Sequence, residues 1–360
     1  MTIAEWRLAA ATDQTLRPSG NMLKKLSRFE LKPSPYSRRR LFHSMLSQEP
    51  VLFGDFPLRY TLQPFFQVND LPGALKKLFL NTPKTLTRLG KTKQVRYLPV
   101  EKVVDKWQDG RSVFSANDIF FRNAGLHRIF DCSAISDFNI IPDSPPEINF
   151  IEVATLLMGT PGCMTDSHSD DPDGCNYCIR GKKLWFVWDR KEGRQYGLED
   201  CEYDDVYTQA GFSLASFVKL RTANWFTVAA GQTLFLPGNL THKVITLEKY
   251  LGISSFYLGL VNALCTLSRW KFNGTVMVTE PLQEQLTSLL LRQLEETAAG
   301  SRTDKHQWGF YHLQEALRVW QRRYSSHQRD SLCSDPGFRM LVEKMSMYSR
   351  FNIGRRNGGG

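Results

Sequence analysis

Residues 148–260 contain a series of short segments rich in aromatic and β-branched residues, with Gly, Pro, Asn and Asp between them. The clearest segments are residues 149–153, 176–179, 183–188, 225–228, 233–236 and 251–258. Short apolar segments separated by turn residues are typical of a β-sandwich or barrel. This stretch is therefore expected to form a mainly β core, to which the rest of the chain adds helices.

The segments on either side of this core have different patterns. Helical spacing is found at residues 71–80, 281–296 and 307–324, and a strand-like pattern at residues 94–100. We expect four regions along the chain. They are a mixed α/β region at 1–145 that packs on the core, the core at 146–262, a helical region at 263–353 and a flexible tail at 354–360.

The chain carries 46 Lys and Arg against 36 Asp and Glu, which gives a formal net charge of +10. Such an excess attracts acidic partners, including nucleic acid. The basic residues form small scattered clusters, however, and the chain has no zinc-finger spacing, aromatic RNA-binding consensus or basic region with heptads. Nucleic-acid binding is therefore left open as a less favoured interpretation.

No segment approaches the roughly 18 consecutive apolar residues that a membrane helix needs, and the N-terminal residues make a poor secretory signal. Seven irregularly spaced cysteines fit reduced thiols better than a disulfide scaffold. Cys175 and Cys178 lack a second Cys or His pair at zinc spacing, so we interpret them as strand cysteines. We expect a protein without membrane association, located in the cytoplasm or, in a eukaryote, also in the nucleus.

Three residues suggest a metal centre. His168 and Asp170 are two positions apart, and in an extended segment such residues point to the same side. His242 follows a strand and a Pro-Gly-Asn turn further along the chain. Two imidazoles and one carboxylate form the facial triad that binds Fe(II) and leaves positions open for a co-substrate and dioxygen. The alternative is a surface His-Asp pair and an unrelated, hydrogen-bonded His242.

Lys183 strengthens the metal interpretation. It lies 13 residues after Asp170 and begins an apolar strand, where burying an ammonium group without an anion is costly. If the iron uses a 2-oxo acid, Lys183 is placed to bind the far carboxylate, with the Thr165 hydroxyl as a further donor. The alternative is that Lys182 and Lys183 extend their ammonium groups into solvent at the end of the strand.

Two other features are interpreted from the sequence. Residues 193–221 form a long insertion between core strands, and loops of such length often serve as a lid or a substrate wall. Near the C-terminus, a histidine and several aromatic residues are expected to pack the helices together. They are Trp308, Phe310, His312 and Trp320.

The combined motifs resemble a known family. They are Thr165-x-x-His168-x-Asp170, then Gly181-Lys-Lys183, and later Gly231-x-x-Leu-Phe-Leu-Pro237 followed by His242. In this order and spacing they resemble the JmjC domain of the cupin superfamily over residues 145–260. The most similar branch is the small hydroxylases, which include the asparaginyl hydroxylase acting on hypoxia-inducible factor.

The resemblance implies a double-stranded β-helix, or jelly roll, that uses Fe(II), 2-oxoglutarate and dioxygen. It implies that His168, Asp170 and His242 are the iron ligands, and that Lys183 and Thr165 bind the 2-oxoglutarate carboxylate. The C-terminal helices resemble those that cap the barrel or form a homodimer in the small hydroxylases.

The chain also departs from the family pattern. The usual Thr-Pro-x-His reads Thr-Asp-Ser-His here, so the first ligand lacks its preceding proline. The tyrosine that often assists 2-oxoglutarate binding is not identified from the sequence. Asn176, on the strand before Lys183, is a candidate for a further polar contact near the oxo acid.

The function expected from the sequence is a dioxygenase that hydroxylates a C–H bond in an amino-acid side chain of a protein or peptide. Hydroxylation of a small metabolite or natural-product intermediate is the second interpretation, and methyl-lysine demethylation is the third. A cupin-type scaffold that has lost catalysis is the alternative from a different functional class.

Overall fold

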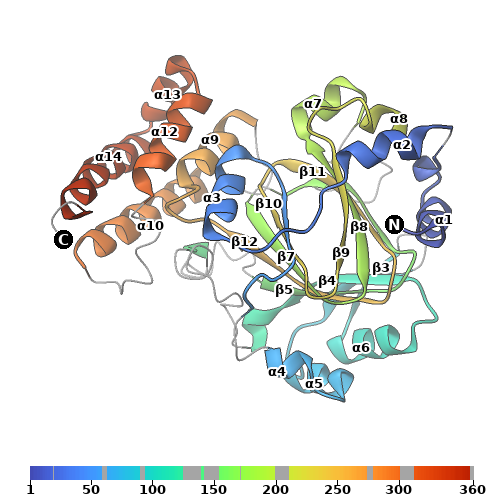
Figure 1. Ribbon diagram of the computed structural model, residues 1–360. Helices are drawn as coiled ribbons and strands as arrows, with labels where there is room; N and C mark the ends of the chain where they lie inside the picture. Colours follow the sequence, from blue (N-terminus) through green and yellow to red (C-terminus); the bar gives the residue numbers. More distant parts are fainter. Residues whose placement is uncertain are drawn as a thin grey trace.

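The core of the computed structural model is a sandwich of two antiparallel sheets (Figure 1). The structure describes residues 1–18, 20–58, 63–89, 94–124, 139–141, 154–170, 172–198, 211–273, 279–300 and 312–356. Within these residues one sheet has eight strands and the other has four. Two facing antiparallel sheets are consistent with the expected jelly-roll core.

The larger sheet combines strands from distant parts of the chain. In spatial order they are β1 (Val51–Phe53), β10 (Thr233–Leu236), β7 (Asp173–Arg180), β12 (Tyr250–Tyr257), β5 (Ala154–Gly159), β4 (Phe114–Phe120), β2 (Thr85–Leu89) and β3 (Gln94–Leu98). The smaller sheet contains β6 (Met164–Ser169), β11 (Leu240–Thr246), β8 (Lys182–Asp189) and β9 (Asn224–Ala229). Strands before residue 145 thus belong to the same sheet as those of the expected core.

The central residues of strand β8, 184–188, are all apolar because both faces of the strand are covered. Trp185 and Val187 lie in the cluster between the two sheets, where the Trp185 and Phe226 rings stack at 6.5 Å. Leu184 and Phe186 belong to a second cluster, on the opposite face of β8. Because successive strand residues point to opposite faces, a strand covered on both sides needs apolar residues at every position.

Helices cover the outer faces of both sheets (Figure 1). The helices α1 (Ile3–Thr12), α2 (Met22–Leu26) and α8 (Leu214–Phe217) contribute buried residues to the cluster on the outer face of the smaller sheet, and η1 (Gln14–Leu16) joins them. The helices α3 (Arg38–Ser47), α5 (Leu71–Leu78) and α6 (Val100–Asp109) belong to the large cluster beside the eight-stranded sheet. Shorter elements are η2 (Ser27–Phe29), α4 (Gln63–Phe66), η3 (Phe121–Ala124) and α7 (Arg190–Gln195).

The C-terminal part of the described chain is helical. It contains α9 (Ala263–Asn273), α10 (Glu280–Ala298), α12 (Leu313–Arg323), α13 (Ser326–Cys333) and α14 (Pro336–Arg356). Leu286, Leu290 and Leu294 are fully buried, which is the helical spacing expected for an apolar face turned toward its neighbours. None of the described helices has the length and apolar character needed to span a membrane.

Most elements predicted from the sequence pattern are confirmed. Those expected at residues 71–80, 94–100, 176–179, 183–188, 225–228, 233–236, 251–258 and 281–296 are α5, β3, β7, β8, β9, β10, β12 and α10. The helix expected at 307–324 is observed from Leu313, and residues 301–311 lie outside the described residues. The strand expected at 149–153 also lies outside them. The helix α14 continues to Arg356, three residues into the expected tail. The four-region division itself stays a prediction.

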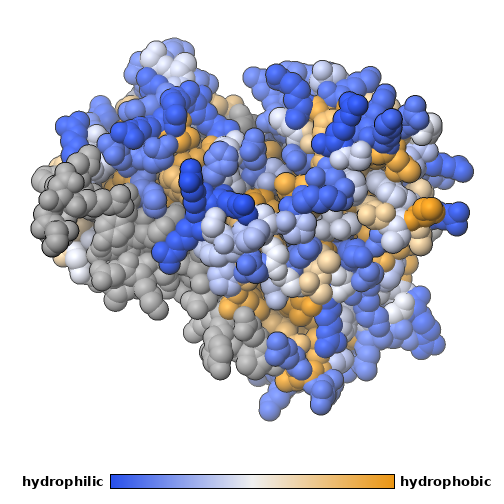
Figure 2. Space-filling view, viewed as in Figure 1, coloured by the Kyte–Doolittle hydropathy of each residue, from blue (hydrophilic) through white to orange (hydrophobic). Residues whose placement is uncertain are grey.

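The face of the molecule seen in Figure 2 is mostly hydrophilic, with smaller hydrophobic areas between the polar side chains. This agrees with the distribution of basic residues in small clusters along the chain. Three consecutive arginines, for example, are exposed in the first turn of α3.

Candidate metal centre

Two neighbouring strands of the smaller sheet bring three candidate ligands together. His168 on β6 is directly opposite His242 on β11, and their ring centroids are 4.1 Å apart. Asp170 follows β6, and its Oδ2 lies 3.7 Å from Nε2 of His242. One ligand atom from each of the three residues lies within 4.8 Å of the other two. The structure therefore brings together the three residues whose spacing suggested a metal site.

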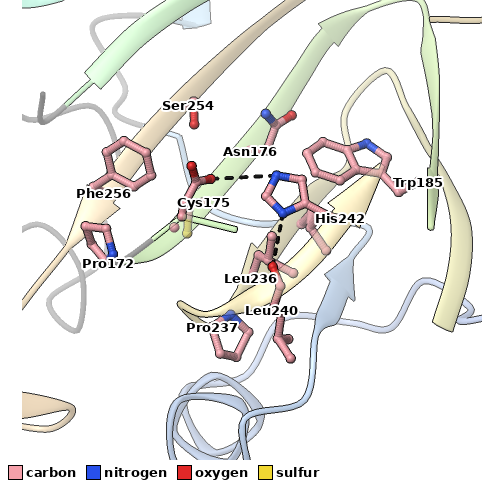
Figure 3. Close-up of a pocket in the computed structure, with 13 residues that line it drawn as sticks. Pro172, Cys175, Asn176, Trp185, Leu236, Pro237, Leu240, His242, Ser254 and Phe256 are labelled. Atoms are coloured by element: carbon pink, nitrogen blue, oxygen red, sulfur yellow. Dashed lines mark hydrogen bonds and ion pairs between the residues drawn. The ribbon is translucent and has the colours of Figure 1, made fainter. Parts of the chain in front are cut away.

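Both imidazoles are oriented by backbone carbonyl groups. Nδ1 of His168 is 2.7 Å from the Asp166 carbonyl oxygen, and Nδ1 of His242 is 3.2 Å from that of Leu240 (Figure 3). Because a carbonyl oxygen only accepts hydrogen bonds, each Nδ1 is the donor in this contact, and Nε2 is the nitrogen of each ring that remains to bind a metal. This is the tautomer that binds a metal through Nε2.

His242 is also kept neutral by its surroundings. Its side chain is buried, and burial lowers its pKa to about 4, with the neighbouring His168 acting in the same direction and Asp170 opposing it. A neutral imidazole is a ligand, whereas a protonated one is not. At neutral pH, His242 is therefore ready to bind a metal ion.

The donor set fits a first-row transition metal. Two imidazole nitrogens and one carboxylate oxygen suit Fe(II), and they leave coordination positions for other ligands. Within the described residues, no other group of three or more His, Cys, Asp and Glu side chains is placed to hold an ion. The His-Asp-His group could thus bind a metal and belong to a metal-dependent enzyme.

A pocket opens beside the metal centre (Figure 3). It contains about 350 Å³ of empty space, part of which is open to solvent, and Asp170 and His242 form part of its wall. The Trp185 ring stacks on the imidazole of His242 at 5.4 Å between centroids. Apolar residues make up much of the remaining wall; they include Pro172, Leu236, Pro237, Leu240 and Phe256.

Lys183 is buried in the same interior. Only 8% of the residue is exposed, and its Nζ lies 4.2 Å from the centre of the Tyr250 ring. Burial lowers the pKa of Lys183, although nearby thiols oppose this effect. The interpretation of a lysine extended into solvent is therefore wrong for Lys183. Lys182, on the other face of β8, is partly exposed and pairs with Glu5 at 2.8 Å and with Glu248 at 3.3 Å.

A tyrosine that the sequence analysis did not identify lies beside this lysine. The Tyr250 side chain, on β12, is fully buried, and its hydroxyl donates a 2.7 Å hydrogen bond to Oδ1 of Asn176 on β7. Asn176 in turn lines the pocket (Figure 3). A Cβ atom at Gly252 would lie 2.4 Å from the Tyr250 hydroxyl, so this glycine makes room for the ring. The sequence signal that could have pointed to Tyr250 is the glycine two positions after it in the same strand.

Thr165 is placed on the same face as the two histidines by a β-bulge. Between His242 and Val244 of β11 there is one residue, whereas between their partners His168 and Thr165 on β6 there are two. In a regular strand, residues three positions apart point to opposite faces. The extra residue cancels this difference, so Thr165 and His168 both face the interior of the sandwich.

The described part of the 193–221 insertion lies away from the pocket. Phe212, Leu214 and Phe217 pack with Trp188 on the outer face of the smaller sheet, and no described residue of the insertion lines the pocket. Residues 199–210 lie outside the described residues. The proposed lid or substrate wall is not supported by the part that the structure describes.

Other residues singled out from the sequence have packing roles. Cys178 is buried and burial raises the pKa of its thiol to about 12, which keeps it protonated, and Cys175 is also buried. The His312 ring lies 4.7 Å from that of Phe42, and Trp320 donates to the Ser268 hydroxyl at 2.8 Å. Trp308 and Phe310 lie outside the described residues.

Comparison with known proteins gives no family for the chain. A scan against protein-family models and a search of curated proteins both find no match.

Proposed function

We propose that this protein is an Fe(II)- and 2-oxoglutarate-dependent dioxygenase that hydroxylates a C–H bond in an amino-acid side chain of a protein or peptide. The observation that supports this most is the convergence of His168, Asp170 and His242 within 4.8 Å in an interior that also contains the buried Lys183. A metal site alone fits many reactions. A metal site beside a buried cation fits a co-substrate that carries a negative charge at its far end.

The bound metal, together with 2-oxoglutarate and dioxygen, would supply the oxidising chemistry, in which 2-oxoglutarate becomes succinate and carbon dioxide and one oxygen atom enters the substrate. The chain's own residues do the positioning. His168, Asp170 and His242 would hold the metal, and Asp170 and His242 also form part of the pocket wall.

Lys183 would bind the distal carboxylate of 2-oxoglutarate. Its ammonium group is in an apolar surrounding, where attraction to an anion is stronger than in water. The Tyr250 hydroxyl, already bonded to Asn176, and the Thr165 hydroxyl are further polar groups on this side of the sandwich. Together they would orient the co-substrate, and the apolar wall with Trp185 would limit the access of water.

A peptide side chain is the proposed substrate because the pocket joins the metal centre to solvent between apolar residues. Pro172, Pro237 and Phe256 lie on its wall, and none of them carries a charge that would bind a small anionic metabolite. The primary substrate would then be held by surface contacts outside the pocket, and only one side chain would enter.

The proposal is tested by incubating the purified protein with Fe(II) and 2-oxoglutarate, first without and then with a pool of cell-derived peptides. Succinate release that depends on Fe(II) is expected even without peptide, and one peptide is expected to gain the mass of one oxygen atom. No succinate under either condition would contradict the proposal. Succinate with loss of a methyl group from lysine would indicate a demethylase instead.

A further inference from the structure

A buried lysine lies between two carboxylates directly behind the metal centre. Lys243 follows the ligand His242 on β11, and only 2% of the residue is exposed. Its Nζ is 2.6 Å from Oδ1 of Asp166 and 2.8 Å from Oδ2 of Asp13. Asp166 comes from β6 and Asp13 caps η1 near the N-terminus, so three distant parts of the chain meet at this ammonium group.

The pair with Asp166 coincides with the β-bulge. Lys243 is the single residue of β11 that faces two residues of β6, Asp166 and Ser167. The same Asp166 oxygen that binds Lys243 also accepts a 3.0 Å hydrogen bond from the Ser167 backbone N–H. The side chain of Asp166 therefore fastens both the extra residue of the bulge and the opposite strand.

Asp166 also contacts a ligand directly. Its backbone carbonyl oxygen accepts the proton of Nδ1 of His168 at 2.7 Å, the contact that sets the tautomer of this imidazole. A chain of contacts thus runs from Lys243 through the Asp166 carboxylate and backbone to His168. Groups that orient a ligating imidazole in this way determine how well it binds the metal.

Asp166 stands at the position where the resembled motif, Thr-Pro-x-His, has its proline. A proline limits backbone freedom by its ring. Here a buried ion pair between the two ligand-bearing strands restrains the same residue.

We propose that Asp166, held by Lys243, is a positioning residue. It keeps the bulge and the His168 imidazole in the geometry required for metal binding, and this role rests on the proposed metal site. Asp13 is the second carboxylate partner of Lys243, but it lies at the start of η1 and not on a strand that carries a metal ligand. Its loss should therefore leave the bulge in place, because the contact between Lys243 and Asp166 remains.

The test compares Asp166→Asn with Asp13→Asn. Each variant neutralises one of the two carboxylates of Lys243 and leaves the other, so neither leaves a buried charge without a partner. Affinity for Co(II), a spectroscopic substitute for Fe(II), is measured without 2-oxoglutarate, together with the visible absorption spectrum of the bound ion. D166N should weaken Co(II) binding by about 10- to 100-fold and alter the spectrum. D13N should leave both close to those of the unaltered protein.

Lys243→Met separates positioning from simple charge effects. Removing a positive charge near a cation site would by itself strengthen Co(II) binding, whereas loss of the restraint on Asp166 should weaken it. Weaker binding by K243M therefore supports the proposal, and stronger binding overturns it. If K243M does not fold, the D166N and D13N comparison decides.

Unchanged Co(II) affinity in D166N, or equal losses in D166N and D13N, would overturn the positioning role. Failure of the unaltered protein to bind Co(II) would be a different result, because it would contradict the metal site itself. Thermal unfolding of the metal-free variants is measured in parallel, so that a loss of affinity with unchanged unfolding temperature is assigned to the site.

Discussion

At the scale of single residues, the candidate metal centre depends on which nitrogen of each imidazole carries the proton. The carbonyl groups of Asp166 and Leu240 fix this choice, and burial keeps His242 neutral. Nε2 of His242 lies 3.7 Å from Oδ2 of Asp170. Among the described residues, no other group of three His, Cys, Asp or Glu side chains is placed to hold an ion.

Replacing a ligand should remove metal binding. We expect His168→Ala and Asp170→Ala each to abolish Fe(II) binding and succinate release, because two remaining donors hold the ion too weakly. Metal content after dialysis and 2-oxoglutarate turnover are the measurements. His43→Ala, which removes an exposed imidazole, is the control and should change neither. Full activity in H168A or D170A would refute the ligand assignment.

Lys183 and Lys182 provide a matched pair for testing the carboxylate site. Lys183→Ala should raise the apparent KM for 2-oxoglutarate about 10- to 100-fold, the effect of losing a hydrogen bond between charged groups. Lys182→Ala should leave this KM unchanged, because its partners Glu5 and Glu248 are outside the pocket. Steady-state kinetics with varied 2-oxoglutarate measure both, and equal KM values would exclude Lys183 from binding the co-substrate.

At the scale of structural elements, the turn between β7 and β8 places Lys183. Gly181 in this turn has φ +83°, and a Cβ atom there would lie 2.2 Å from the Lys249 backbone oxygen. Only glycine combines this conformation with such a close approach. The turn and the neighbouring strand β12 are therefore packed backbone to backbone, next to Tyr250.

Two glycine substitutions separate backbone conformation from steric contact. Gly231 has the same φ, +83°, but open space around its Cβ position. Gly231→Ala should cost about 1 kcal/mol in free energy of unfolding, as expected for an L residue in the left-handed region. Gly181→Ala should cost about 1–3 kcal/mol more, because the Lys249 backbone must move as well. Chemical denaturation measures both, and equal losses would contradict the close contact.

At the scale of the whole molecule, ion pairs fasten the N-terminal segment to the smaller sheet. Glu5 on α1 binds Lys182, and Asp13 binds Lys243. Burial raises the pKa of each of these carboxyl groups, but the lysine partners and hydrogen bonds outweigh burial, and both pKa values end below their ordinary values of 4.5 and 3.8. The segment is thus docked most firmly when both carboxylates are charged.

This docking predicts loss of stability in acid. A carboxyl group whose pKa is lower in the folded state stabilises the fold above its unfolded pKa, and the contribution disappears as pH falls through the folded pKa. The unfolding temperature should therefore fall as pH drops below about 4.5. In the double variant Glu5→Gln and Asp13→Asn this decline should be shallower. Identical pH profiles for the variant and the unaltered protein would contradict the prediction.

The residue pattern was enough to predict the local features: strands that alternate between two faces, helices with apolar stripes, and the order of the motif residues around His168, Lys183 and His242. These features depend on spacing along the chain, and spacing sets which face a side chain occupies. Lys183 could be singled out for the same reason, since an ammonium group at the start of an apolar strand is unusual.

The features that depend on strand pairing could be seen only once the strands were placed side by side. The bulge that turns Thr165 inward, the burial of Lys183 against Tyr250, and the pair between Asp166 and Lys243 all join residues from different strands. Asp166 and Lys243 are 77 positions apart, and nothing in either local segment specifies the partner. Register is set by how two sheets bury their apolar faces together, which is a property of the whole fold and not of any one segment.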